Sequence, residues 1–216
     1  MVNERWNKNE EAIGISLPEQ IAKYILKKIM EGDLVQGDKI VEEYIASELK
    51  TSRAPVREAL YLLQVDNIVE RIPRRGTIVK SFTEKEIKEY AEVMAGLIQM
   101  AFDMSKDQWI QSTVVAGVDQ KLEALDEVFA ERKLIEYQQK ANVLTGYFFE
   151  VADNKALNKF YHESVYILNV FAQVKWKVET MEHFHPQINR IVALLKDQKI
   201  EEAKAIVPNL LMDTLE

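Results

Sequence analysis

Glycine and proline are scarce in this chain, with seven glycines and five prolines among 216 residues. Few positions can therefore form tight turns or interrupt a helix. From Thr83 onward no segment has a strand pattern, whereas apolar residues recur at helical spacing. We expect this part to be an all-helical bundle of about six helices joined by short breaks. The expected helices span roughly residues 83–104, 115–131, 134–152, 156–182, 187–195 and 201–212.

The first eighty residues have a different organisation. Helical spacing of apolar residues predicts a helix over 17–30, with Pro18 in the first turn, where its missing N–H costs nothing. A short extended piece follows, and then a second helix over roughly 41–49. After a tight turn, Ser52 is a good N-cap for a third helix over roughly 53–66. The residues expected on the buried face of the second helix are Tyr44, Ile45 and Leu49.

The apolar period changes after the third helix. Two short runs rich in β-branched residues, 68–72 and 78–79, flank the loop Pro73–Gly76. Such runs around a Pro/Gly loop predict a β-hairpin. Helix, helix, tight turn, helix and hairpin is the element order of a winged helix-turn-helix, whose third helix enters the DNA major groove.

Arginines occur at the two places where such a module would touch DNA. Arg53 and Arg57 are four residues apart and share one face of the first turns of the third helix. An arginine fork matches guanine O6 and N7, and Arg74 and Arg75 stand at the tip of the hairpin. Taken alone, the first pair is usually a solvated helix face and the second an ordinary turn, but their joint order favours DNA binding.

The charge distribution agrees with a polyanion-binding segment. Residues 50–80 hold seven basic and three acidic side chains, a net charge of +4. Since the whole chain carries −7, the remainder sums to −11. A local basic segment on an acidic chain suggests a module that binds nucleic acid, although charge alone does not separate this from chance.

The segment from Gly37 to Val79 resembles the DNA-binding domain of the GntR family of bacterial transcription regulators. The resemblance implies base contacts from Arg53 and Arg57, and a wing whose Gly76 lets the backbone approach the minor groove. The residues that carry it are Gly37-Asp38, Ile45-Ala46, Leu49, Ser52-Arg53-x-Pro55-Val56-Arg57-Glu58-Ala59-Leu60, Leu63 and Arg74-Arg75-Gly76-Thr77-x-Val79. The candidate DNA-binding residues are Ser52, Arg53, Arg57, Arg74, Arg75, Gly76 and Thr77.

The helical remainder resembles the effector domain of the FadR subfamily of this family. The resemblance rests on Asp153-Asn154-x-x-Leu157 and on Ile200-Glu201-Glu202-Ala203, and it implies an effector-binding and dimerising unit. We expect a winged helix-turn-helix domain over 1–82, of which 1–16 is an N-terminal extension, and a helical domain over 83–216.

Several positions depart from that subfamily. Many of its members hold a divalent metal with an Asp, a His four residues later and two further histidines. Counted back from Asn154, the first two of these positions fall on Ala141 and Thr145, which cannot bind a metal as that pair does. An arginine and a glutamate usual in the first helix correspond to Met94 and Ile98. We therefore expect no metal and no cofactor, and an effector pocket at Met94, Ile98, Ala141, Thr145 and His185.

The sequence offers little for catalysis. Cysteine is absent, no Gly-rich phosphate loop occurs, and no carboxylate pair lies in an apolar setting. His183 and His185 are expected to cap or flank a helix boundary before Pro186. We expect no catalytic residues and no enzyme activity. The alternative is a helical metal-dependent enzyme, or a scaffold protein, on which the basic module is incidental.

These features together predict a transcription regulator. We expect double-stranded operator DNA, a small-molecule effector and a second copy of the chain as partners, since a palindromic operator requires a two-fold dimer. No apolar run reaches the roughly 18 residues needed to cross a membrane, and the first residues lack a secretory signal pattern. A cytoplasmic location without a membrane partner fits best, because cysteine is absent as well.

Overall fold

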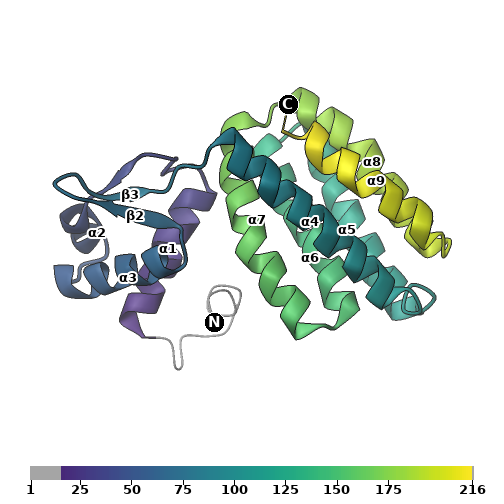
Figure 1. Cartoon of the computed structure of the whole chain (residues 1–216), viewed down its shortest axis with the longest axis horizontal. Coiled ribbons are helices and arrows are strands. Elements are labelled where there is room, and N and C mark those ends of the chain that lie inside the picture. The colour runs from purple at the N-terminus through teal and green to yellow at the C-terminus, as the bar shows by residue number, and fades with distance from the viewer. Residues whose placement is uncertain (1–15, 216) are drawn as a thin grey trace. The chain divides into compact units, whose positions relative to one another are not determined.

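The computed structural model divides the chain into two compact units, one ending at Thr83 and one beginning at Glu84 (Figure 1). The expected N-terminal extension over 1–16 falls, except for Ser16, outside the described residues. The structure describes residues 16–215, apart from the side chains of Met30, Glu163, Val170, Phe171, Gln173 and Val174.

The first unit has the element order of a winged helix-turn-helix. Its first helix begins with a capping box, in which the Ser16 hydroxyl accepts from the Glu19 N–H and the Glu19 carboxylate accepts from the Ser16 N–H at 2.9 Å. Pro18 occupies the first turn, as the sequence predicts. The elements are α1 Leu17–Met30, β1 Lys39–Ile40, α2 Glu42–Glu48, α3 Arg53–Val65, β2 Val69–Ile72 and β3 Gly76–Val79.

The sheet of this unit has three strands, in the antiparallel order β1-β3-β2. The sequence predicts only the hairpin of β2 and β3. The extended piece before α2 adds β1, because Lys39 and Ile40 pair with Ile78 and Thr77 on the free side of β3. Because α2 begins two residues after Ile40, this pairing holds the start of α2 close to the hairpin and completes the three-stranded sheet.

The core of the first unit lies where α1 packs against α3. The sequence predicts Tyr44 in this interior, but its side chain is 61% exposed, so that prediction is wrong. Helix α2 has only seven residues and buries Ile45 and Ala46 alone. The apolar side chains that α1 and α3 bury are Ile21, Ala22, Ile25, Ile29, Val56, Ala59, Leu60 and Leu63.

The second unit is all helical in the part that the structure describes. Helix α4 packs against α6, α7 and α9, while α5 packs against α6 and α8 against α9 (Figure 1). The prediction of a mostly helical chain, a winged helix-turn-helix followed by a helical bundle, is confirmed. The helices are α4 Glu84–Ser105, α5 Ser112–Ala130, α6 Leu134–Ala152, α7 Lys155–Lys175, α8 Val178–Lys196 and α9 Ile200–Asp213.

One predicted helix boundary is wrong. The break expected before Pro186 lies instead at Trp176 and Lys177, which are both extended, and α8 continues through Pro186. Next to this break the Trp176 ring packs against Phe184 of α8, with ring centroids 5.3 Å apart. A proline removes one helical hydrogen bond, and α8 buries Phe184 and Ile188 on either side of Pro186, which favours its continuation.

An aromatic cluster forms the centre of the second unit. Phe148 meets Phe102 and Trp109 edge-on, with ring centroids 5.1 and 6.0 Å apart. The Trp109 indole N–H donates to the Ser105 hydroxyl at 3.0 Å, and that hydroxyl donates to the Ala101 carbonyl at 2.7 Å. The polar atoms of this buried cluster are therefore hydrogen-bonded, as a stable core requires.

Within residues 16–215, none of the helices combines the length and the apolar composition that a membrane crossing needs.

Replacing Gly117 with alanine is expected to destabilise the second unit. Alanine is favoured over glycine inside a helix by about 1 kcal/mol. However, a Cβ at Gly117 would overlap the hydroxyl group of Tyr147, which donates to the Val114 carbonyl at 3.1 Å. Overpacking of this kind costs about 1–3 kcal/mol, so the free energy of unfolding should fall in urea denaturation.

The matched control is Gly146→Ala. The nearest heavy atom to a Cβ at Gly146 is the Tyr161 hydroxyl oxygen at 3.4 Å, an ordinary contact. This variant should keep or gain stability, by up to about 1 kcal/mol. Equal unfolding free energies for the two variants would contradict the tight α5–α6 packing at Gly117.

Candidate nucleic-acid interface and helical-domain cavity

The third helix of the first unit presents two arginines on its outer face. Ser52 has the extended backbone of an N-cap, although its side chain makes no capping hydrogen bond. Val56 is fully buried, whereas the side chains of Arg53 and Arg57 are 58% and 59% exposed. The amphipathic pattern of α3 therefore fixes which side packs on α1 and which side carries the guanidinium groups.

Both guanidinium groups meet one carboxylate, that of Glu42 at the start of α2. Arg57 Nη2 donates to Glu42 Oε2 at 3.1 Å, and Arg53 Nη2 donates to the same oxygen at 3.4 Å. The hydrogen bond from Arg57 holds the pKa of the Glu42 carboxyl below its usual value. The sequence pattern does not point to Glu42, because a separation of 11 and 15 residues gives no local signal.

The hairpin tip is shaped by two residues with positive φ. Pro73 and Arg74 occupy the centre of a turn closed by the Arg75 N–H donating to the Ile72 carbonyl at 3.1 Å. Arg74 has φ +67°, and Gly76 has φ +95°, where a side chain would be strained. This arrangement has the proline and the positive φ of a type II turn.

The turn exposes the side chains of Arg74 and Arg75. Thr77 lies on the central strand, paired with Arg71 on one side and with Ile40 on the other. The structure thus brings the predicted residues together as two exposed groups within the first unit. Ser52, Arg53 and Arg57 stand at the start of α3, and Arg74 to Thr77 stand at the hairpin tip.

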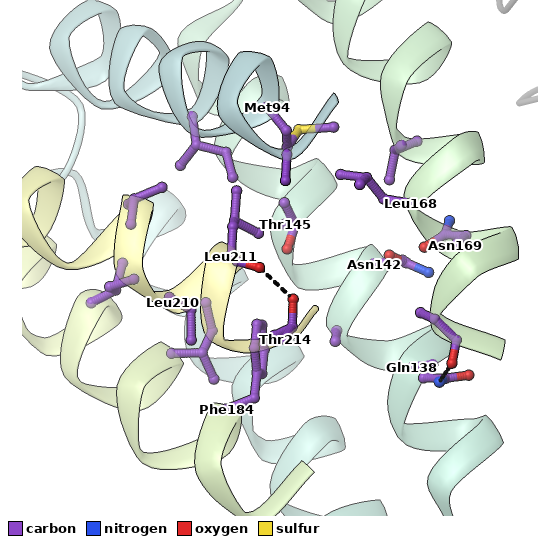
Figure 2. Close-up of a pocket in the computed structure, with 18 of the residues that line it drawn as sticks. Met94, Gln138, Asn142, Thr145, Leu168, Asn169, Phe184, Leu210, Leu211 and Thr214 are labelled. Carbon is purple, nitrogen blue, oxygen red and sulfur yellow. Dashed lines mark hydrogen bonds between the residues drawn. The ribbon is translucent and has the colours of Figure 1, made fainter. Parts of the chain in front are cut away.

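A cavity of about 90 Å³ lies inside the second unit. Four of the five residues predicted to form an effector pocket line it, namely Met94, Ile98, Ala141 and Thr145. Most of the other residues that line the cavity are apolar as well. The lining residues come mainly from α4, α6, α7, α8 and α9, so helices distant in sequence enclose the cavity (Figure 2).

Polar groups enter the cavity from a few positions that the sequence analysis missed. Gln138, Asn142 and Asn169 lie on one side of it, and the Gln138 amide donates to the Ala172 carbonyl at 3.0 Å (Figure 2). Thr214 lies across from them and donates to the Leu211 carbonyl at 2.7 Å. A polar series at 138, 142 and 145, spaced four and three residues apart on α6, is the signal that could have found them.

His185, the fifth predicted pocket residue, is not among the residues that line this cavity. Its ring stacks on Phe129 with centroids 3.7 Å apart, and its Nδ1 is 3.3 Å from the Tyr137 hydroxyl. Its Nε2 lies 3.3 Å from an oxygen of Asp126. Because α8 continues through Pro186, the expectation that His185 flanks a helix boundary is wrong.

His183 points elsewhere, as residues two apart on a helix must. Its Nε2 is 3.2 Å from an Asp213 carboxylate oxygen near the end of α9. Among the side chains that the structure describes, no group of three or more from His, Asp or Glu is arranged to hold a metal ion. At Ala141 and Thr145, where the resemblance would put metal ligands, the cavity wall has a methyl and a hydroxyl group.

A family model matches the first unit. Residues 17–79 match the model described as "Bacterial regulatory proteins, gntR family", so this part of the chain is similar to the domain that the model describes. The match covers the three helices and the hairpin, and with them both arginine groups.

Two curated relatives match over less than half of this chain. The chain is 30% identical over 89 residues to an uncharacterized HTH-type transcriptional regulator, YdhC, of Bacillus subtilis, covering 41% of this chain and 40% of that one. It is 36% identical over 84 residues to the gluconate operon transcriptional repressor of the same species, covering 39% and 34%. The match therefore spans well under half the length of these relatives.

Two solved structures share the fold over nearly the whole chain. A putative transcriptional regulator GntR from Rhodococcus sp. RHA1 has a TM-score of 0.83 at 18% identity, covering 93% of this chain and 96% of that one. E. coli McbR/YncC has a TM-score of 0.79 at 16% identity, covering 92% and 94%. At such identities the likeness shows that the fold is shared and does not extend to a ligand.

The environment of His185 predicts how stability depends on pH. Burial lowers the pKa of His185 from 6.5, against the opposing pull of Asp126. At pH values near and below about 6.5, His185 therefore binds protons more readily in the unfolded chain than in the folded chain. The free energy of unfolding should fall as the pH drops through that value. In urea denaturation at about pH 7.5 and about pH 5.5, His185→Gln should lose less stability than the wild type.

His162, whose pKa burial also lowers, is present in both proteins and provides the common background. An equal loss of stability in the two proteins would show that His185 is not held in its neutral form.

Proposed function

We propose that this protein is a sequence-specific, DNA-binding transcription regulator whose affinity for its operator is modulated by a small molecule. The gntR-family match over 17–79, with Arg53 and Arg57 exposed together on α3, is the observation that carries the proposal. The names of the curated relatives, which are regulators and repressors, agree with it. Such a regulator would act where the chromosome is, in the bacterial cytoplasm.

In this proposal α3 enters the major groove with its N-terminal turns foremost. Arg53 and Arg57 would then contact base edges, with the Ser52 hydroxyl and the α3 N-terminus near a phosphate. Arg74 and Arg75 at the hairpin tip would bind phosphates and the minor groove, and Gly76 and Thr77 would bring the backbone close to the sugar-phosphate chain.

We further propose that the protein is a homodimer through its second unit. Outward-facing apolar side chains on α4 support this, because Val93, Met100 and Met104 are 47–55% exposed along one face. A dimer also supplies the two DNA-binding units that a palindromic operator needs. Sedimentation equilibrium of the full chain measures the oligomeric state.

The effector site in this proposal is the cavity of the second unit, as in the FadR subfamily that the helical sequence resembles. Its walls are apolar, and the amides of Asn142 and Asn169 with the Thr145 hydroxyl offer hydrogen bonds. Ligand pockets commonly have this composition. Among the described side chains, those that line the cavity include no acidic or basic one, so we propose a small, uncharged effector and no bound metal.

The size of the cavity limits that effector. A cavity of about 90 Å³ is smaller than the roughly 150 Å³ apolar cavity that admits benzene in an engineered protein. An effector larger than this cavity can therefore bind only if α7, α9 or their side chains move apart. A ligand that prefers such an opened arrangement shifts the population of the second unit, and with it the affinity for DNA.

Arg57→Ala should change which sequence the protein prefers. Removing one two-pronged interaction with guanine costs about 1–3 kcal/mol and relaxes the preference at one base pair. The fold should remain intact, because the Arg57 side chain is exposed. The measurement is selection of binding sites from a random-sequence duplex pool, followed by affinity measurement at stated salt.

Arg75→Ala is the control for this variant. Removing a phosphate-binding side chain from the hairpin tip should weaken binding to all sequences alike and reduce the salt slope by about one. If Arg57→Ala selected the same sequences as the wild type, α3 would not be the element that contacts bases.

Ala141→Leu should abolish the response to the effector. The three added carbon atoms point into the cavity, which Ala141 lines, and would fill much of it. A small molecule at about 100 times its Kd stabilises the wild type by about 2.7 kcal/mol, a clear thermal shift. The variant should fold and bind DNA, yet lose the shift produced by a compound that a screen of uncharged metabolites finds with the wild type.

Ala116→Leu, an identical change on the exposed face of α5, should leave the thermal shift unchanged. A compound that stabilises Ala141→Leu as much as the wild type would place the effector site elsewhere.

A further inference from the structure

The carboxylate of Glu42 lies between the two arginines of α3. Arg57 approaches it side-on, with Nε 3.5 Å from Oε1 and Nη2 3.1 Å from Oε2. Arg53 donates from Nη2 to the same Oε2 at 3.4 Å. One acidic group from α2 therefore gathers both guanidinium groups at the surface that would meet DNA.

This arrangement leaves the guanine-contacting edge of Arg57 free. A guanidinium group has five N–H bonds, and Glu42 engages the one on Nε and one on Nη2. Both hydrogens on Nη1 and the second hydrogen on Nη2 remain, and these form the end-on fork that fits guanine O6 and N7. Glu42 thus contacts the side of Arg57 that a base would not use.

The charge of Glu42 also favours base contacts over phosphate contacts. Its side chain is 22% exposed, and the hydrogen bond from Arg57 keeps its pKa below the usual value, so it stays ionised near neutral pH. One negative charge beside two positive ones weakens their attraction to phosphate, which is the same for every sequence. Base contacts, which depend on direction, are weakened less.

We propose that Glu42 is a positioning residue for DNA recognition, one that holds Arg53 and Arg57 in a paired arrangement and so raises sequence selectivity. This inference rests on the proposed function, since it requires that α3 contact bases. In this role Glu42 itself would touch neither base nor phosphate. Side chains fixed before binding lose less freedom on binding, so their contacts contribute more fully to affinity for the correct sequence.

The neighbouring Glu43 provides a matched control. It is exposed, it lies on the same helix, and the described contacts include none between it and either arginine. Glu43→Gln therefore removes the same charge without disturbing the pair. Glu42→Asp keeps the charge but shortens the side chain by one methylene, which withdraws the carboxylate from contacts already 3.1–3.5 Å long.

The experiment compares the wild type with Glu42→Gln, Glu43→Gln and Glu42→Asp in the full-length chain. Two probes are used: the duplex that the wild type enriches from a random-sequence pool, and a scrambled duplex of equal length and composition. Fluorescence anisotropy gives Kd for each over a series of salt concentrations. The selectivity is the ratio of the Kd for the scrambled duplex to that for the enriched duplex, and thermal unfolding checks that each variant is folded.

Glu42→Gln should lower the selectivity about tenfold, the effect of weakening one guanine contact, while binding the scrambled duplex at least as tightly as the wild type does. Its salt dependence should steepen by about one, as a freed arginine binds a phosphate instead. Glu43→Gln should keep the wild-type selectivity, and Glu42→Asp should fall between the wild type and Glu42→Gln.

Two results would overturn the positioning role: equal selectivity for Glu42→Gln and Glu43→Gln, or wild-type selectivity for Glu42→Asp. A wild-type chain that enriches no sequence at all would overturn the proposed function, and this inference with it.

Discussion

The packing of one face of α4 supports the whole helical unit. Small residues, Ala91, Ala95 and Ala101, let α6, α7 and α9 approach this helix closely, and Phe102 joins the aromatic cluster at its end. Apolar burial is the main favourable contribution to such a core. The same face reaches the cavity through Met94, so the helix that holds the unit together also forms a wall of the proposed effector site.

In the first unit α3 likewise packs in the core and also carries a candidate binding surface. Val56 and Leu60 anchor it against α1, and this anchoring turns Arg53 and Arg57 outward together. One side of α3 thus stabilises the first unit, and the opposite side carries the arginines proposed to contact DNA. The contact with Glu42 comes from the preceding helix, which means that the turn between α2 and α3 sets the geometry of the candidate DNA-binding surface as well as the path of the chain.

The positions of Ala141 and Thr145 in the cavity could be predicted from the resemblance to the FadR subfamily because α6 is uninterrupted. Asp153, with φ +47°, ends α6, and the Asn154 side chain accepts from the Leu157 N–H at 3.0 Å to start α7. With this connection fixed, counting back along a regular helix places Ala141 and Thr145 on one face. The same count fails for His185, since the break between α7 and α8 lies elsewhere than the sequence predicts.

The sequence by itself determined the order of the elements, the side of α3 that carries arginines and the turn at the hairpin tip. These depend on spacing, capping and turn preferences within a few residues. Only the tertiary structure decided that Ile40 joins the sheet, that Glu42 meets both arginines and that the chain breaks at Trp176 rather than before Pro186. Each of these depends on a contact between different helices or strands, and such a contact leaves no periodic trace in the sequence.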